Sequence, residues 1–155
     1  MKHIKLFDSY KITNSDNKGD SFNYYFNTNK LEYKISISKY NDGYWSIGFK
    51  AKNPEDYFYE HDVIANENPY EIMDTVVKVA KDFYIKKLKE IEELKKVFKN
   101  ADINEKDFIK GYVFSFTGDK EKNLQRLNLY KRYFNKLGMD THFSIKDNIF
   151  YLEIK

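Results

Sequence analysis

The segment from residue 31 to residue 51 alternates apolar and polar side chains on both sides of a short turn sequence. A period of two places one set of side chains on a core and the other in water, as in a half-buried β-strand. Between the two runs stand Asn41, Asp42 and Gly43, and Asp-Gly in that position is a strong hairpin signal. The core-facing set is Leu31, Tyr33, Ile35, Ile37, Trp45, Ile47, Phe49 and Ala51. We therefore expect two antiparallel strands that bury large side chains on one face.

The residues around this hairpin predict a larger sheet. Residues 22–26 are expected to form a strand that pairs ahead of the hairpin. Residues 13–20, rich in Asn, Ser, Asp and Gly, are expected to form a loop. The first ten residues fit either a short strand or a helical turn, and residues 57–65 are predicted to be extended.

A long helix is predicted over residues 69–98. Asn68 can cap its free amide groups, Pro69 suits the first helical position, and the side chain of Glu71 can reach back to the cap. The apolar stripe at helical spacing is Ile72, Val76, Val79, Phe83, Leu88, Ile91, Leu94 and Phe98. The distal half is heavily charged with a narrow apolar seam, so we expect it either to project from the domain or to dock on a partner.

A second unit follows the long helix. The pattern predicts a strand over 108–116, a loop at 117–119 and a helix over 120–137 that stops at Gly138 in the left-handed conformation. A final hairpin is expected from residues 142–145 and 149–154. The buried side of the shorter helix is predicted to be Leu124, Leu127, Tyr130 or Lys131, Phe134 and Leu137.

These elements predict an α+β fold in which a mostly antiparallel sheet carries one long and one shorter helix. A length of 155 residues suits one domain. We expect residues 1–56 to form an N-terminal β-hairpin sheet within it and residues 57–155 a helix-strand-helix-hairpin half.

Composition excludes several classes of function. The chain has no cysteine, which removes disulfides, Cys-ligated metals and thiol nucleophiles, and aromatic residues make up 18% of it, so rings must fill much of the core. The net charge is +3, with acidic and basic residues mixed along the chain, and only Arg126 and Arg132 are arginine, so nucleic acid is not an expected partner.

No apolar run is long enough to span a membrane, and the N-terminus lacks the features of a signal peptide. A cytoplasmic location is therefore expected, which for a phage protein means the host cytoplasm or the virion. The abundance of Lys, Asn, Tyr and Ile is typical of an AT-rich genome, as in certain bacteria and their phages.

The three histidines, His3, His61 and His142, stand in no metal-ligand spacing, and no metal is expected. His61 lies between Glu60 and Asp62, which could raise its proton affinity and make it, or Glu60, a general base. The alternative is a half-exposed strand histidine beside acids.

Two further segments allow a functional and a structural interpretation. Residues 117–119, Thr-Gly-Asp before a helix, could receive an anion, but one glycine and an acid favour a plain helix cap. The rings of Tyr40, Tyr44 and Trp45 could stack on nucleic-acid bases, and the alternative is that they pack the sheet.

The helix around residues 123–130 resembles the last motif of GNAT-type acetyltransferases. Asn123, Leu129 and Tyr130 have the spacing of the asparagine and the Leu-Tyr pair in that motif, and the order of elements is also similar to that fold. In the family the tyrosine commonly serves as general acid to the leaving coenzyme A thiolate. The resemblance implies that role for Tyr130 and a place beside the cofactor for Asn123 and for Arg126, which stands where the family usually has a small residue. The chain is also similar to small uncharacterised phage proteins that have a hairpin sheet, a long helix and an Arg-x-x-Leu-Tyr helix ending in glycine.

The pyrophosphate loop of that family is missing from this chain. At its place stands the sequence Asn66-Glu67-Asn68-Pro69-Tyr70, which has no glycine, loses an amide donor at the proline and carries an acid, with Glu71 following. We therefore expect no cofactor and predict a non-catalytic domain that binds other proteins, self-association included, as a phage accessory or virion protein. The alternative is an N-acetyltransferase that uses acetyl-CoA, and the third possibility is binding of single-stranded nucleic acid.

Overall fold

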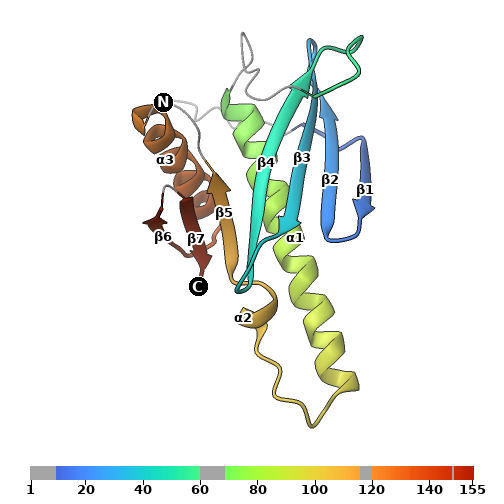
Figure 1. Ribbon diagram of the computed structural model, residues 1–155, viewed down its shortest axis with the longest axis vertical. Helices are drawn as coiled ribbons and strands as arrows, with labels where there is room; N and C mark the ends of the chain where they lie inside the picture. The colour runs from blue at the N-terminus through green and yellow to red at the C-terminus, as the bar shows by residue number, and fades with distance from the viewer. Residues whose placement is uncertain (1–9, 60–68, 116–119, 148) are drawn as a thin grey trace, which may run out of the picture.

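A computed structural model describes residues 10–59, 69–115, 120–147 and 149–155 of the chain (Figure 1). The fold is α+β: a seven-stranded, mostly antiparallel sheet with three helices. The strands are β1 (Asn14–Lys18), β2 (Ser21–Asn27), β3 (Glu32–Lys39), β4 (Tyr44–Lys52), β5 (Gly111–Ser115), β6 (Thr141–Lys146) and β7 (Ile149–Ile154). The helices are α1 (Pro69–Val97), α2 (Glu105–Phe108) and α3 (Lys120–Lys136).

The strand order in the sheet is β1-β2-β3-β4-β5-β7-β6. Every neighbouring pair is antiparallel except β4 and β5, which run parallel. A parallel pair needs a long crossover between its strands, and here the chain from residue 53 to residue 110, which includes α1, makes that crossover.

The predicted hairpins are confirmed. In the β3–β4 hairpin Ile37 pairs with Ile47. The turn has Asp42 at φ 51° and Gly43 at φ 84°, the two positive values that a tight hairpin turn requires. The β6–β7 hairpin likewise turns through a residue of positive φ, Asp147.

The prediction of a loop over residues 13–20 is wrong, because residues 14–18 form β1 and pair with β2. This strand lies at an edge of the sheet, and most of its side chains are exposed. A polar edge strand has no apolar alternation to reveal it, since neither of its faces is deeply buried.

The predicted helices 69–98 and 120–137 are confirmed as α1 and α3, and Gly138 follows α3 with φ 79°. The predicted strand over 108–116 is partly wrong: β5 begins only at Gly111, and residues 105–108 form the single helical turn α2. The side chain of Asn104 caps this turn by accepting a hydrogen bond from the Lys106 amide at 3.0 Å. Residues 57–59 are not in a strand, and the rest of the predicted stretch 57–65 lies outside the described residues.

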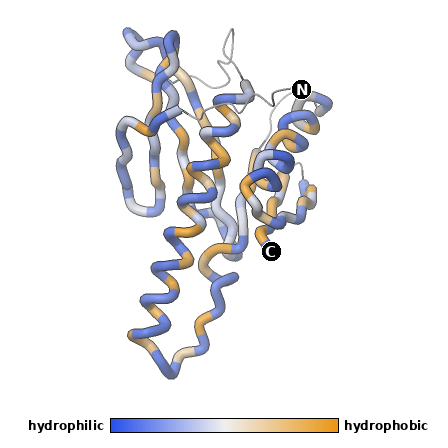
Figure 2. Tube along the Cα trace, turned by 180° about the vertical axis from the view of Figure 1, so that it is seen from behind, coloured by the Kyte–Doolittle hydropathy of each residue, from blue (hydrophilic) through white to orange (hydrophobic). Residues whose placement is uncertain are grey.

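Both α1 and α3 cover the same face of the sheet (Figures 1 and 2). Trp45 and Tyr112 are direct partners on β4 and β5, so their side chains share a face. Trp45 packs on Phe83 of α1 and Tyr112 on Phe134 of α3. Buried residues from both halves of the chain therefore form one core, rich in aromatic rings as the composition predicts.

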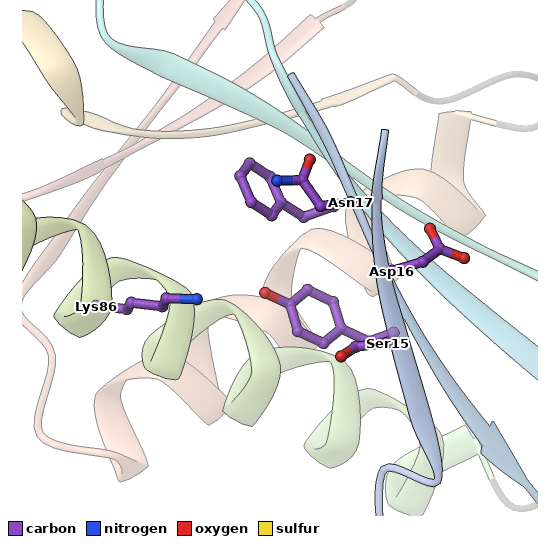
Figure 3. Close-up of a pocket in the computed structure, with 6 residues that line it drawn as sticks. Ser15, Asp16, Asn17 and Lys86 are labelled. Atoms are coloured by element: carbon purple, nitrogen blue, oxygen red, sulfur yellow. The ribbon is translucent and has the colours of Figure 1, made fainter. Parts of the chain in front are cut away.

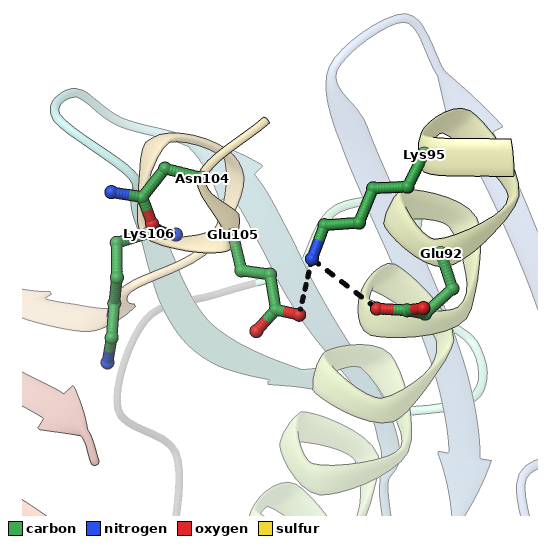
Figure 4. Close-up of polar contacts among 5 residues, drawn as sticks. All are labelled: Glu92, Lys95, Asn104, Glu105 and Lys106. Atoms are coloured by element: carbon green, nitrogen blue, oxygen red, sulfur yellow. Dashed lines mark hydrogen bonds and ion pairs between the residues drawn. The ribbon is translucent and has the colours of Figure 1, made fainter. Parts of the chain in front are cut away.

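The distal part of α1 extends beyond the sheet and returns through α2 (Figure 1). We call residues 88–108 the arm. The Lys95 ammonium pairs with Glu105 of α2 at 3.1 Å and with Glu92 of its own helix at 3.5 Å (Figure 4). These contacts tie the two limbs of the arm together and hold α2 against α1.

Candidate functional site

The parallel strands β4 and β5 separate toward their carboxyl ends. They pair only from Tyr44 with Gly111 to Ser46 with Val113, although β4 continues to Lys52. Figure 1 shows the two strands diverging toward the end of the molecule at which α1 begins. Ligands commonly bind at the carboxyl ends of parallel strands in α/β sheets, where neighbouring strands part. This split is therefore the candidate functional site.

Tyr130 of α3 packs against the carboxyl-terminal half of β5. Its side chain is 4% exposed, and its ring centroid lies 4.4 Å from that of Phe114. Burial raises the pKa of the Tyr130 phenol, and the nearby positive charge of Arg126 offsets a small part of that rise. Tyr130 is thus a neutral hydroxyl at physiological pH.

The structure brings two of the predicted site residues together. Arg126 is half-buried, one helical turn before Tyr130 on α3. Asn123 is on the same helix, but its side chain is not among those described. Glu60 and His61, the predicted bases, lie outside the described residues.

The beginning of α1 is acidic. Glu71 accepts a hydrogen bond from the Tyr10 hydroxyl at 2.9 Å. The hydroxyl of Thr75 donates to the Glu71 carbonyl at 2.8 Å and accepts from the Tyr10 amide at 2.9 Å. A fixed carboxylate therefore already occupies the first turn, where the helix dipole would favour an anionic ligand.

Sequence reasoning missed a second acid in this region. Asp74 is 4% exposed, and its carboxylate lies 3.1 Å from the Lys78 ammonium. Its negative charge also contributes to a raised pKa of Tyr133 on α3, for which burial is the larger cause. Asp74 stands within a run of residues from Ile72 to Val77 that are all buried. An acid within such a helical segment was the sequence signal that could have drawn attention to Asp74.

The aromatic stretch near residue 44 has a packing role. Trp45 is buried, and its indole N–H donates to the Phe108 carbonyl at 3.0 Å. Tyr44 is half-buried on the opposite face of the sheet, with its ring centroid 5.1 Å from that of Tyr151. The packing interpretation therefore holds for Trp45, whose ring is not available to stack on a base.

Within the described ranges, no three His, Asp or Glu side chains gather closely enough to hold a metal ion. None of the helices in those ranges is both long and apolar enough to cross a bilayer.

Searches against protein-family models, curated proteins and solved structures found no match to this chain. The comparisons assign no family.

Alkaline pH is expected to destabilise the protein through its buried tyrosines. Burial raises the pKa of Tyr112 and Tyr130 above 10, so the unfolded state releases these protons first. Their contribution to stability is complete below about pH 10 and is lost as pH rises toward the folded-state pKa. Each should lower the free energy of unfolding by about 1.4 kcal/mol per pH unit in that range.

Urea unfolding at several pH values between 9 and 11 would measure this slope. Tyr130→Phe should make the slope shallower, and the double variant with Tyr112→Phe should make it shallower again. An identical slope in wild type and both variants would contradict the prediction.

Proposed function

We propose that this chain is a non-catalytic protein-binding domain on a GNAT-like scaffold, and that it serves as a phage accessory or virion protein. Support for the scaffold comes from the order of elements, with antiparallel strands, a long helix, a strand, a shorter helix and a final hairpin. That order agrees with what the sequence resemblance implies. Support for the phage role comes from the composition, in which Lys, Asn, Tyr and Ile are abundant, as in proteins of AT-rich genomes.

The acidic start of α1 argues against acetyl-CoA chemistry. A pyrophosphate placed at this helix end would meet the carboxylate of Glu71 in the first turn. The Tyr10 hydroxyl holds this carboxylate in place, so it cannot easily move away from the anion. Like charges at such short range oppose binding of the anion.

The observation that carries the binding proposal is the apolar surface of the arm. Val97 is 73% exposed and Phe98 is 56% exposed, and Leu94 and Phe108 are also exposed there. Figure 2 shows a mostly hydrophilic arm with short apolar segments along it. Exposed apolar side chains grouped on a projecting element are typical of protein-binding surfaces.

One experiment tests catalysis. Acetyl-CoA is titrated into the full chain by calorimetry and by thermal shift up to millimolar concentration. The proposal expects neither heat nor a shift. Micromolar binding that is weakened by Tyr130→Phe would overturn the proposal in favour of the enzyme.

A second experiment tests binding through the arm. The double variant Val97→Ser, Phe98→Ser is compared with Ile145→Ser, which changes an apolar residue on β6 that is 57% exposed. Light scattering over a concentration series measures self-association, and affinity capture measures binding of other proteins. The arm variant should lose the interaction while the Ile145 variant retains it, and an equal loss in both would contradict the proposal.

The second candidate is an acetyl-CoA-dependent N-acetyltransferase with Tyr130 as acid and His61 or Glu60 as base. The observation that favours it is the neutral phenol of Tyr130 beside Arg126 at the end of β5. A general acid must carry its proton before it acts, and burial keeps the proton on this tyrosine.

A further inference from the structure

A pocket of about 290 Å³ lies between the β1–β2 hairpin and α1, away from the split between β4 and β5 (Figure 3). It is lined by Ser15, Asp16, Asn17, Phe22, Tyr24 and Lys86. The volume suits a small metabolite and is too small for a dinucleotide. None of the sequence motifs pointed to it, because its residues come from β1, β2 and α1.

The cation of the pocket is unpaired. Within the described ranges the Lys86 ammonium has neither a hydrogen bond nor an ion pair. The neighbouring Lys87, by contrast, pairs with Glu90 at 3.1 Å and lies 5.1 Å from the centroid of the Trp45 ring. Figure 3 shows the Lys86 side chain reaching from α1 toward the strands, with Ser15 and Asn17 on the facing strand β1.

The acid in the lining does not face Lys86. The Asp16 side chain points to the other side of β1 (Figure 3). There its carboxylate accepts hydrogen bonds from Asn23 and from the Tyr25 hydroxyl, both at 2.7 Å, and these bonds lower the pKa of Asp16. The negative charge is thus satisfied outside the pocket, and the side chains of Ser15, Asn17, Tyr24 and Lys86 inside it can all donate hydrogen bonds.

Two aromatic residues of β2 complete the lining. Burial raises the pKa of the Tyr24 phenol, with a smaller contribution from the charge of Asp82 on α1, so the phenol is a neutral donor at pH 7. Phe22 is fixed by its contacts with Trp45 and Phe83, at centroid distances of 6.0 and 5.2 Å. Its ring offers a rigid apolar wall beside the donors.

We propose that this pocket binds a small organic carboxylate with a flat apolar body, of about the size of benzoate. Lys86 would neutralise the carboxylate, the side chains of Ser15, Asn17 and Tyr24 would donate to its oxygens, and Phe22 would cover the apolar body. A single ammonium with no arginine matches one negative charge, which favours a carboxylate over a doubly charged phosphate. Asp82 opposes the anion and limits its affinity.

The test is a titration of the ¹⁵N-labelled full chain by NMR, with benzoate as the probe. Benzoate should give saturable shifts at the amides of Ser15, Asn17, Tyr24 and Lys86. Benzamide, which has the same shape without the charge, should bind at least about tenfold more weakly than benzoate. Inorganic phosphate at the same concentrations should also bind more weakly than benzoate.

Three variants make the test specific. Lys86→Gln should weaken benzoate binding about tenfold, and Asp82→Asn should strengthen it severalfold, because these changes remove opposite charges beside the pocket. Lys89→Gln is the matched control, an exposed lysine on the same helix that does not line the pocket, and it should change nothing. The proposal is overturned if benzoate gives no saturable shift, or if benzamide or phosphate binds as tightly as benzoate. It is also overturned if Lys86→Gln and Lys89→Gln bind benzoate with the same affinity.

Discussion

Replacing Gly111 by alanine is expected to lower the free energy of unfolding by about 3 kcal/mol, at the upper end of what overpacking usually costs. A Cβ at this position would lie 1.8 Å from the Leu152 carbonyl oxygen and 3.0 Å from the Cα of Glu153. Both atoms belong to the backbone of β7, so no side-chain rotation can relieve the contact. Strands β5 and β7 would have to separate at the centre of the sheet.

Gly48→Ala is the matched control for this substitution. Gly48 lies in β4, and a Cβ there would meet no heavy atom within 4 Å. Alanine should be neutral or slightly stabilising at that position, because it loses less conformational freedom on folding than glycine. Urea denaturation of both variants measures the difference, and equal stabilities would contradict the predicted clash.

Tyr112→Ala is expected to lower the free energy of unfolding by about 3–5 kcal/mol, the range for removing a buried aromatic side chain. Tyr112 has no exposed surface, and it contacts both long helices from the middle of the sheet. Its hydroxyl donates to the Ala80 carbonyl of α1, and its ring stacks near Phe134 of α3 with centroids 6.3 Å apart. Loss of the ring would therefore loosen both helices from the strands.

Tyr112→Phe separates the hydroxyl from the ring. It should cost about 1 kcal/mol, the usual contribution of one hydrogen bond. Tyr57→Ala, at a tyrosine that is 87% exposed, should change stability by less than about 0.5 kcal/mol. If Tyr112→Phe were as destabilising as Tyr112→Ala, the account based on ring packing would be wrong.

The binding proposals can fail independently of one another. The pocket beside Lys86 and the arm beyond residue 88 are different surfaces, and the acetyl-CoA titration addresses the split between β4 and β5. If the chain binds benzoate but no protein, the proposal for the pocket is supported and the proposed function is contradicted. If the chain binds a protein but neither benzoate nor acetyl-CoA, the arm is the only one of the three surfaces that is supported.

Elements with a strong local signal were predicted well from the sequence. The β3–β4 hairpin follows from alternation and from Asp42-Gly43, and both long helices follow from apolar spacing. Strand β1 and helix α2 were missed, because one is a polar edge strand and the other is a single turn capped by Asn104. Local patterns report burial, and neither of these short elements buries a periodic face.

The candidate sites show the same limit. Tyr130 and Arg126 were predicted from one helix, where spacing alone brings them together. Asp74 was not predicted as a site residue, because its influence on Tyr133 arises only when α3 packs beside α1. Lys86 was one charged residue among many until the fold placed it opposite Ser15 and Asn17.

Local patterns in the chain were thus enough to predict the α+β class, the two hairpins beside Asp42 and Asp147, the extents of α1 and α3, and the aromatic character of the core. The parallel pairing of β4 with β5, the placement of both helices on one face and the pocket against α1 became visible only in the folded chain. Periodicity encodes which side of an element is buried, whereas the choice of its neighbour comes from packing between residues far apart in the chain, such as Trp45 with Tyr112.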